Sequence, residues 1–317
     1  MASSVLPPAL IVAGPTCSGK SALAMALAAR HGGTVINADS MQVYAELRVL
    51  TARPTPADEA AVPHALYGVR RAAEPGSVAW WRATALDAMA GAALPILCGG
   101  TGLYLAALTQ GLADIPEPSP AARAEARGLL DAEGPGGLYQ LLRDADPATA
   151  AGLRPSDGQR LARAWEVWRS TGKGLAAWQA QATVPAPFRF RMILLDPPRQ
   201  ALRDAIADRF GDMLAAGAVA EAAALLEQEL DPVLPAMRAH GVPELAAYLD
   251  GEISLAEAER RAVGATGRYT KRQATWFRHR SPVAGADTHT IHARFAGLQQ
   301  FSESSWADIE SFISGIG

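Results

Sequence analysis

The feature that most constrains the fold is an apolar run that ends in a glycine-rich loop. Residues 9–13 read ALIVA, and the next eight residues match G-x-x-x-x-G-K-[ST] at Gly14, Gly19, Lys20 and Ser21. A run of helix-favouring residues follows, so the order is strand, loop and helix. Amides at a helix start and the helix dipole together favour a phosphate group. The sequence therefore predicts an α/β protein whose loop binds a di- or triphosphate.

The basic residues of the chain single out one position in this loop. The sequence contains 26 arginines and three lysines, and one of these lysines is Lys20. This usage indicates that the loop needs a compact ammonium group rather than a planar guanidinium. Lys20 can neutralise phosphate oxygens, and the Ser21 hydroxyl can bind Mg²⁺. A glycine-rich turn without a ligand is the alternative, and the agreement between motif and flanks argues against it.

Composition restricts the class of protein further. The chain has 317 residues, of which 49% are hydrophobic, so it can form one large domain or two smaller ones. Cys17 and Cys98 fit no disulfide or zinc pattern, which suits a reducing cytoplasm. The N-terminus carries no basic leader segment, and no apolar run reaches the roughly 18 residues of a membrane helix. We therefore expect a cytoplasmic protein with no membrane partner.

Two further short strands are predicted to bring polar residues to the phosphate loop. The β-rich run 34–38 ends at Asp39, and the run 94–98 leads into the glycine-rich turn that contains Thr101. Ligands of an open parallel sheet bind beyond the carboxyl ends of its strands, so both residues are expected near the loop. Asp39 can accept a proton from a nucleophile there. A helix N-cap explains the same Asp equally well at this point.

Composition also indicates where the domains divide. Prolines cluster in 111–120, and the stretch 121–178 has a helical pattern without a β-rich run. We predict a discontinuous P-loop α/β core of residues 1–112 and 188–284, which contains a long helix over 199–229. Residues 113–187 form a helical insertion, and the tail 285–317 packs on the core. Asp196 ends another predicted strand. We favour its interpretation as a polar cap of that strand over its interpretation as a Mg²⁺ ligand.

The strongest charge feature lies near the C-terminus. Residues 260–280 read RRAVGATGRYTKRQATWFRHR, with six arginines, one lysine and no acid in a chain of net charge −3. Arg261, Arg268 and Arg272 fall on one face of a helix. Such a face attracts phosphate backbones, and neighbouring aromatic side chains can stack on bases. A solvated basic helix without a ligand is the alternative.

Four of these segments together resemble a known family. The segments GPTCSGKS, INADSMQVY, PILCGGTGLYL and RYTKRQATWFRHR occur in this order and resemble the bacterial tRNA dimethylallyltransferase family, also called tRNA isopentenyltransferase. The resemblance covers roughly residues 8–280. It implies a P-loop α/β core with a helical insertion and a requirement for Mg²⁺. It also implies transfer of a prenyl group from dimethylallyl diphosphate to the N6 amine of the adenosine directly 3′ of the tRNA anticodon.

The resemblance also implies roles for individual residues. The catalytic residues would be Asp39 as the base, together with Thr101 and Arg209. The diphosphate-binding residues would be Gly14, Thr16, Cys17, Ser18, Gly19, Lys20 and Ser21, with Ser21 also on Mg²⁺. The insertion domain is implied to bind tRNA. The tRNA-binding residues would be Asp39, Ser40, Met41, Gln42, Thr101, Arg123, Gln159, Arg160, Leu161, Ala162, Arg163, Arg238, His240, Gly241, Arg268, Lys271 and Arg272.

Two other function classes remain compatible with parts of the sequence. An ATP-dependent small-molecule kinase or NTPase would use the same loop and an Asp after the second strand, but it gives no reason for the basic segment 260–280. A nucleotide-dependent RNA-binding protein gives no reason for Asp39 and Thr101 beside the loop. For a prenyl substrate we expect an apolar pocket with walls drawn from Met41, Val43, Leu103 and Tyr104. A monomer is expected, with the anticodon stem-loop and dimethylallyl diphosphate as partners.

Overall fold

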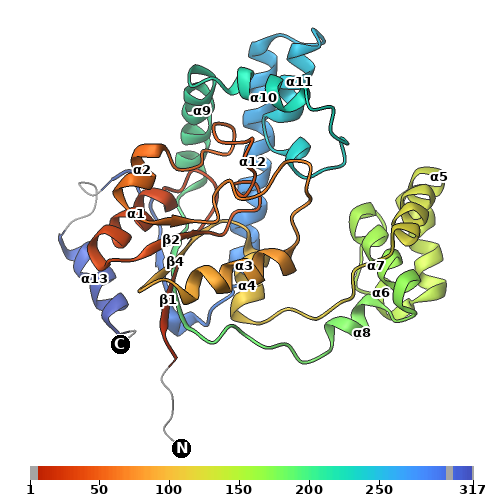
Figure 1. Cartoon of the computed structure of the whole chain (residues 1–317), viewed down its shortest axis with the longest axis horizontal. Coiled ribbons are helices and arrows are strands. Elements are labelled where there is room, and N and C mark those ends of the chain that lie inside the picture. The colour runs from red at the N-terminus through yellow and green to blue at the C-terminus, as the bar shows by residue number, and fades with distance from the viewer. Residues whose placement is uncertain (1–5, 298–302, 316–317) are drawn as a thin grey trace, which may run out of the picture. The chain divides into compact units, whose positions relative to one another are not determined.

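The computed structural model describes residues 6–297 and 303–315, and its centre is a six-stranded parallel sheet (Figure 1). The strand order is β3-β2-β4-β1-β5-β6, and every neighbouring pair is parallel. The strands are β1 (Pro8–Ala13), β2 (Thr34–Asn37), β3 (His64–Ala65), β4 (Pro95–Gly99), β5 (Arg189–Leu195) and β6 (Thr288–Ile291). The predicted α/β class with a parallel sheet is thereby confirmed.

Helices cover both faces of this sheet, which explains why its central strands are apolar throughout. In β1, Leu10 and Val12 face a cluster with the helices α1 (Lys20–His31) and α13 (Glu303–Ser314). Ile11 and Ala13 face the opposite cluster, to which α3 (Val78–Ala90) and α4 (Gly102–Thr109) contribute. A parallel strand that is buried on both faces needs a continuous apolar run rather than an alternating one.

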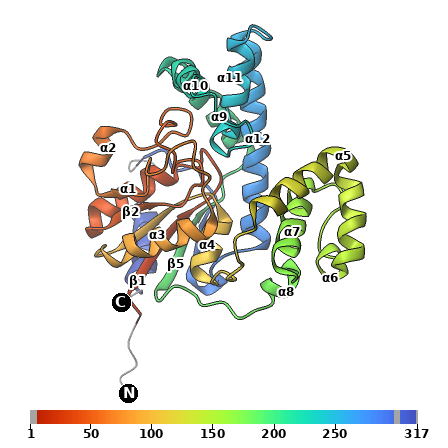
Figure 2. The same ribbon diagram turned by 45° about the vertical axis from the view of Figure 1, so that its right-hand side comes forward.

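A group of helices packs around one long helix beyond the sheet (Figure 2). The long helix is α12 (Leu255–His279), and α9 (Arg199–Ala215) and α11 (Val242–Leu249) pack against it. The prediction of a single helix over 199–229 is wrong, because the chain turns at Gly217 (φ 100°) before α10 (Ala218–Leu226). The remaining elements are α2 (Pro56–Ala61), η1 (Ala236–Arg238) and η2 (Gly285–Asp287).

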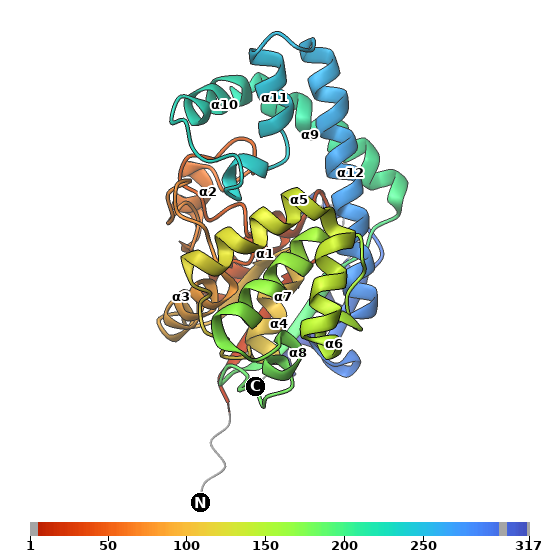
Figure 3. The same cartoon turned by 90° about the vertical axis from the view of Figure 1, so that its right-hand side faces the viewer.

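The chain divides into two compact units, of which residues 111–185 form the second and the remainder the first. The described helices of the second unit are α5 (Pro120–Ala145), α6 (Pro147–Ala150), α7 (Gly158–Thr171) and α8 (Leu175–Gln179) (Figure 3). A kink at Gly134–Pro135 bends α5, and α5 packs on α7. A small apolar core holds this unit together, with Leu142, Leu161 and Trp165 among its buried members.

The C-terminal segment contributes a strand as well as a helix. β6 extends the sheet by pairing with β5, with Met192 opposite Thr288. Ile309 and Ile313 of α13 are buried against the β1 and α1 side of the core. The sequence predicted that this tail packs on the core, but the short polar run THTI carries no strand signal. In the part of the chain that the structure describes, no helix has both the length and the apolar character to cross a membrane.

Candidate active site

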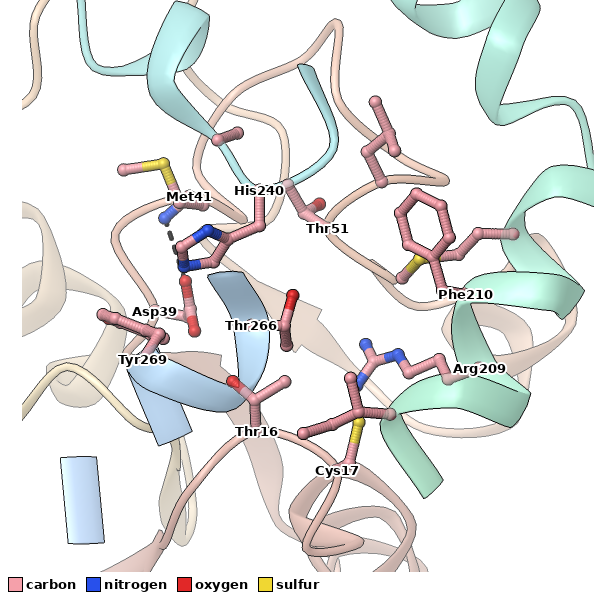
Figure 4. Close-up of a pocket in the computed structure, with 14 residues that line it drawn as sticks. Thr16, Cys17, Asp39, Met41, Thr51, Arg209, Phe210, His240, Thr266 and Tyr269 are labelled. Atoms are coloured by element: carbon pink, nitrogen blue, oxygen red, sulfur yellow. Dashed lines mark hydrogen bonds between the residues drawn. The ribbon is translucent and has the colours of Figure 1, made fainter. Parts of the chain in front are cut away.

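The carboxyl ends of the strands lead into a pocket that contains several predicted site residues (Figure 4). Thr16 and Cys17 follow β1, Asp39 and Met41 follow β2, and Arg209 comes from α9. The side chains of His240 and Tyr269 close the pocket from other elements. Segments far apart in the sequence therefore place a basic loop, a carboxylate and a guanidinium around one space.

The loop between β1 and α1 has the conformation of an anion-binding site. Helix α1 begins at Lys20, and the amides of its first turn have no acceptor within the helix. No side chain caps them either. Gly19 has φ 93°, and a Cβ there would clash with the carbonyl oxygen of Phe295. Cys17 also has a positive φ, of 65°. The amides, aligned with the positive end of the helix dipole, favour a bound phosphate group.

Lys20 lies folded back on this loop. Its Nζ donates a hydrogen bond to the Pro15 carbonyl oxygen at 2.7 Å. Burial of the ammonium lowers the pKa of Lys20, and the nearby Arg209 acts in the same direction, while Asp39 opposes it. An anionic ligand would favour the charged form of Lys20. The buried Ser18 hydroxyl of the same loop has no hydrogen-bond partner among the described residues.

Two arginines anchor the phosphate loop from opposite segments. Arg209 donates from Nη1 to the sulfur of Cys17 at 3.6 Å, and its guanidinium points into the pocket (Figure 4). Arg294 donates from Nε to the Cys17 carbonyl oxygen at 2.9 Å, and the next amide, of Phe295, donates to the Ser18 carbonyl oxygen. The loop is therefore held by the C-terminal segment as well as by the core.

Asp39 is oriented by a buried asparagine that the sequence analysis did not identify. Asn37 has no exposed surface, and its Oδ1 accepts from the Asp39 amide at 2.8 Å. Its Nδ2 donates to the carbonyl oxygens of Asp39 and Leu66. The Asp39 carboxylate in turn accepts from the Met41 amide at 2.9 Å. No helix begins after Asp39, so the N-cap alternative is wrong.

Thr101 lies at the start of α4 and reaches the segment that carries Asp39. Its hydroxyl oxygen accepts from the Ser40 amide at 3.0 Å, and its own amide donates to the Ala38 carbonyl oxygen. The glycines around it permit this close approach, because a Cβ on Gly99 would clash with the Ala38 backbone. Asp39 and Thr101, which follow different strands, are thus brought together as predicted from the topology.

His240 and Tyr269 complete the polar part of the pocket. Burial raises the pKa of the Tyr269 phenol to about 12, although hydrogen bonds with the Thr101 and Gln273 side chains act against this shift. Burial lowers the pKa of His240, and Arg272 acts in the same direction, while Asp39 opposes it. The lowered pKa leaves the His240 imidazole uncharged at neutral pH.

The apolar wall of the pocket differs from the one expected. Of the four candidates, only Met41 lies on the wall. Val43 is fully buried in the core, Leu103 is exposed, and Tyr104 stacks on Trp81 with 4.3 Å between ring centroids. The wall is formed instead by Met41, Leu50, Ile206, Phe210 and Met213. Helix α9 supplies most of these side chains. The resemblance implied a role for Arg209 of this helix, but no sequence pattern indicated that its apolar residues would line the pocket.

The residues fit a cation that takes most of its ligands from a bound phosphate. Ser21 is exposed on the first turn of α1, and its hydroxyl contacts the thiol of Cys98. Burial raises the pKa of Cys98 to about 11, so this thiol stays protonated at neutral pH. In the described ranges, no cluster of three or more His, Cys, Asp or Glu side chains is arranged to hold a metal. Mg²⁺ binds in this manner, through few protein ligands, phosphate oxygens and water.

The residues predicted to bind RNA divide between the two compact units. Arg238, Arg268, Lys271 and Arg272 are exposed on the first unit. Arg123, Gln159 and Arg160 are exposed on the second, and Arg123 pairs there with Glu117 at 2.6 Å. Their exposure leaves all of these side chains accessible to a large ligand.

Three of the residues predicted to contact RNA are buried or already hydrogen-bonded in the structure. Leu161 and Gly241 are buried, so a side-chain contact of Leu161 with RNA is excluded in this conformation. The side-chain amide of Gln42 donates to the carbonyl oxygens of Thr51 and Ala52, so it stabilises a loop of the protein itself. Helical periodicity would have placed Leu161 in the core, because it lies on one face of α7 with the apolar Ala164 and Trp165.

The sequence of this chain is similar to those of known proteins. The model of the IPP transferase family matches residues 42–280. The tRNA dimethylallyltransferase of Acidiphilium cryptum is 61% identical over 97% of this chain and 95% of its own length. The protein of the same name from Gluconobacter oxydans is 61% identical over 96% and 94%.

Solved structures have the same fold. The tRNA isopentenylpyrophosphate transferase of Bacillus halodurans is 30% identical with a TM-score of 0.67, covering 98% of this chain and 96% of that one. A eukaryotic dimethylallyltransferase, crystallised acting on tRNA, has a TM-score of 0.80 at 24% identity and shares the fold over 98% of this chain and 80% of its own. The family match begins after Asp39 and includes β4, β5 and all of α12. This chain belongs to the IPP transferase family.

Proposed function

We propose that this protein transfers a dimethylallyl group from dimethylallyl diphosphate to the exocyclic N6 amine of an adenosine in tRNA, directly 3′ of the anticodon. The observation that carries the proposal is the pocket itself, in which an anion-binding loop, the Asp39 carboxylate and an apolar wall from α9 face one space. The relatives from Acidiphilium cryptum and Gluconobacter oxydans are tRNA dimethylallyltransferases, which supports the same reaction.

In the proposed reaction one bond breaks, one bond forms and one proton moves. The bond between the allylic carbon and the diphosphate oxygen breaks, and the electron pair leaves with the diphosphate. The N6 nitrogen forms a bond to that carbon, and the proton that N6 loses passes to Asp39. A neutral adenine amine is a weak nucleophile, so departure of the diphosphate and removal of the proton both need assistance.

The diphosphate is stabilised by the loop and by Arg209. The first-turn amides of α1, the Lys20 ammonium and the guanidinium of Arg209 offset the charge that develops on the leaving group. Mg²⁺ bound by the Ser21 hydroxyl and phosphate oxygens would supply further charge neutralisation. The apolar wall around Phe210 and Met213 excludes water from an allylic carbon that carries partial positive charge.

Asp39 acts as the base because its surroundings hold the carboxylate in a fixed orientation. Asn37 fixes its backbone, and the Met41 amide binds one of its carboxylate oxygens. The Thr101 hydroxyl accepts from the adjacent Ser40 amide and so holds the segment that carries Asp39. The adenosine must leave the anticodon-loop stack to reach this carboxylate. The exposed basic side chains of α12 and of the second unit bind the tRNA backbone, and the protein acts as a monomer in the cytoplasm.

An ATP-dependent kinase or NTPase is the second candidate, because the loop motif suits any β-phosphate. Such chemistry needs a carboxylate on the metal beside the loop. Asp196 is the residue at the end of β5 that would fill this role, and its carboxylate lies outside the pocket, 3.8 Å from His292. Mass analysis of tRNA nucleosides after incubation with dimethylallyl diphosphate tests the proposal. A product adenosine that gains one dimethylallyl group supports it, and unmodified tRNA contradicts it.

A further inference from the structure

Gln273 is a buried polar residue on α12, and its side chain connects the two glycine-rich loops. Only 4% of the residue is exposed. Its Oε1 accepts from the amide of Thr16 at 2.9 Å and from the Thr16 hydroxyl at 3.2 Å. Its Nε2 donates to the Gly100 carbonyl oxygen at 3.1 Å. One carboxamide therefore binds the phosphate loop after β1 and the turn after β4.

The fit around this side chain is close. A Cβ on Gly100 would clash with Gln273 Nε2, and a Cβ on Gly102 would clash with the Trp276 ring. Tyr269, one turn earlier on α12, hydrogen-bonds with both Gln273 and Thr101. Residues 269, 273 and 276 lie on one face of the helix, because they are spaced by four and three positions. This face of α12 is thus seated against the turn that carries Thr101.

We infer that Gln273 is a positioning residue that fixes the diphosphate-binding loop relative to Asp39 and Thr101. The inference rests on the proposed function, because two substrates held by two loops react only when the loops keep the correct separation. A misplacement of about 1 Å at a reacting centre costs on the order of 100-fold in rate. The bond to Thr16 leaves the later loop amides, at the start of α1, free for the anion.

The alternative is that Gln273 only stabilises the fold, as buried hydrogen-bonded groups commonly do. The two roles differ in what they predict. A purely structural role lowers the unfolding temperature and leaves the rate of the folded fraction unchanged. A positioning role lowers the rate of fully folded protein and weakens diphosphate binding, while tRNA binding is unaffected because the basic side chains of Arg268, Lys271 and Arg272 remain in place.

The test uses Gln273→Met, which keeps the length of the side chain and removes its hydrogen bonds. Thr270→Val is the matched control, because Thr270 is also buried on α12 and its hydroxyl bonds only within the helix, to Gly267. Thermal unfolding, the Kd for inorganic diphosphate, the Kd for tRNA and the single-turnover rate at saturating substrates are measured for each. We expect Gln273→Met to lose at least about tenfold in rate and diphosphate affinity, with tRNA affinity within twofold of wild type.

Gln273→Glu provides a second readout that a structural role would not produce. A neutral carboxyl group has one donor and one acceptor and mimics the amide, whereas the carboxylate repels the Gly100 carbonyl oxygen. The ratio of the variant rate to the wild-type rate should therefore rise as the pH falls, and the ratio removes any pH dependence that both proteins share. A pH-independent ratio contradicts the inference.

Other outcomes separate the inference from the proposed function. A Gln273→Met protein with the rate and diphosphate affinity of wild type overturns the inference, even if its unfolding temperature is lower. Thr270→Val with an equal loss of rate does the same. If wild-type protein transfers no prenyl group, the proposed function fails. The diphosphate affinity of Gln273→Met then decides whether Gln273 positions the loop.

Discussion

The hydroxyl oxygen of Thr101 accepts a hydrogen bond from the backbone amide of Ser40 across 3.0 Å. These residues are 61 positions apart, and one follows β4 while the other follows β2. Because Ser40 is adjacent to Asp39, this contact fixes the segment that carries the proposed base. The side chain of Thr101 therefore acts on this segment through the backbone of Ser40.

Thr101→Val should lower the transfer rate without unfolding the protein, because valine keeps the shape of threonine and removes the acceptor of the Ser40 amide. A partly buried hydrogen bond of this kind contributes about 1 kcal/mol, so stability should change little. Single-turnover kinetics and thermal unfolding check the prediction. Thr101→Ser, which retains the hydroxyl, should restore most of the rate, and equal rates for the valine and serine variants would argue against the role.

Asp39→Asn should leave the fold and tRNA binding intact and slow transfer by roughly 10² to 10⁴-fold, the contribution of a positioned base. The amide can still accept from the Met41 amide, but it cannot take the N6 proton. The measurement is the single-turnover rate at saturating tRNA. Asp204→Asn, at an exposed carboxylate on α9, serves as the control. A rate for Asp39→Asn within a few-fold of wild type would remove Asp39 as the base.

Diphosphate binding should weaken as the pH rises through the lowered pKa of Lys20. Burial lowers this pKa in the free protein, whereas a bound anion favours the ammonium, so binding takes up a proton once the pH exceeds the lowered value. Titration calorimetry with inorganic diphosphate across neutral to alkaline pH measures the effect. Lys20→Ala should bind more weakly and lose this part of the pH dependence. An identical profile in both proteins would mean that Lys20 does not contact the anion.

Arg268→Ala, Arg272→Ala and Arg160→Ala should each weaken tRNA binding and reduce its dependence on salt. Each lost phosphate contact lowers the slope of log K against log salt by up to about one unit. All three side chains are exposed, and Arg160 has only a 3.6 Å pair with Asp157 to break. Arg30→Ala, on the far end of α1, is the control. Unchanged slopes in all three variants would mean that these faces are merely solvated.

Dimethylallyl diphosphate should bind more tightly than inorganic diphosphate, and ATP should neither support transfer nor be hydrolysed. The apolar wall formed by residues such as Ile206 and Phe210 can bury five carbon atoms, at about 0.8 kcal/mol for each CH₂-sized group. Competition calorimetry and a phosphate-release assay measure these properties. Tight ATP binding with tRNA-stimulated hydrolysis and no prenyl transfer would favour the NTPase alternative.

The sequence by itself determined the parallel α/β core and the position of its anion-binding loop. Continuous apolar runs before Gly14 and Gly99 predict strands buried on both faces, and parallel strands end at one edge of the sheet. From this rule alone, Asp39 and Thr101 were expected beside the loop, and the structure brings them together. The motifs in their order also indicated the family. These features are local, so a single sequence is sufficient to reveal them.

Only the tertiary structure decided which distant side chains complete the site. Gln273, Phe210 and Arg294 approach the strand ends because long helices and the C-terminal segment pack there, and no local pattern encodes that approach. Asn37 lies inside the predicted β-rich run 34–38, where nothing in the sequence marks it out, but in the structure its buried side chain supports Asp39. Leu103 and Val43 looked equally suited to an apolar wall, and packing exposed one and buried the other. Helix and strand periods fix the face of each residue, whereas the partner of that face depends on contacts between segments far apart in the chain.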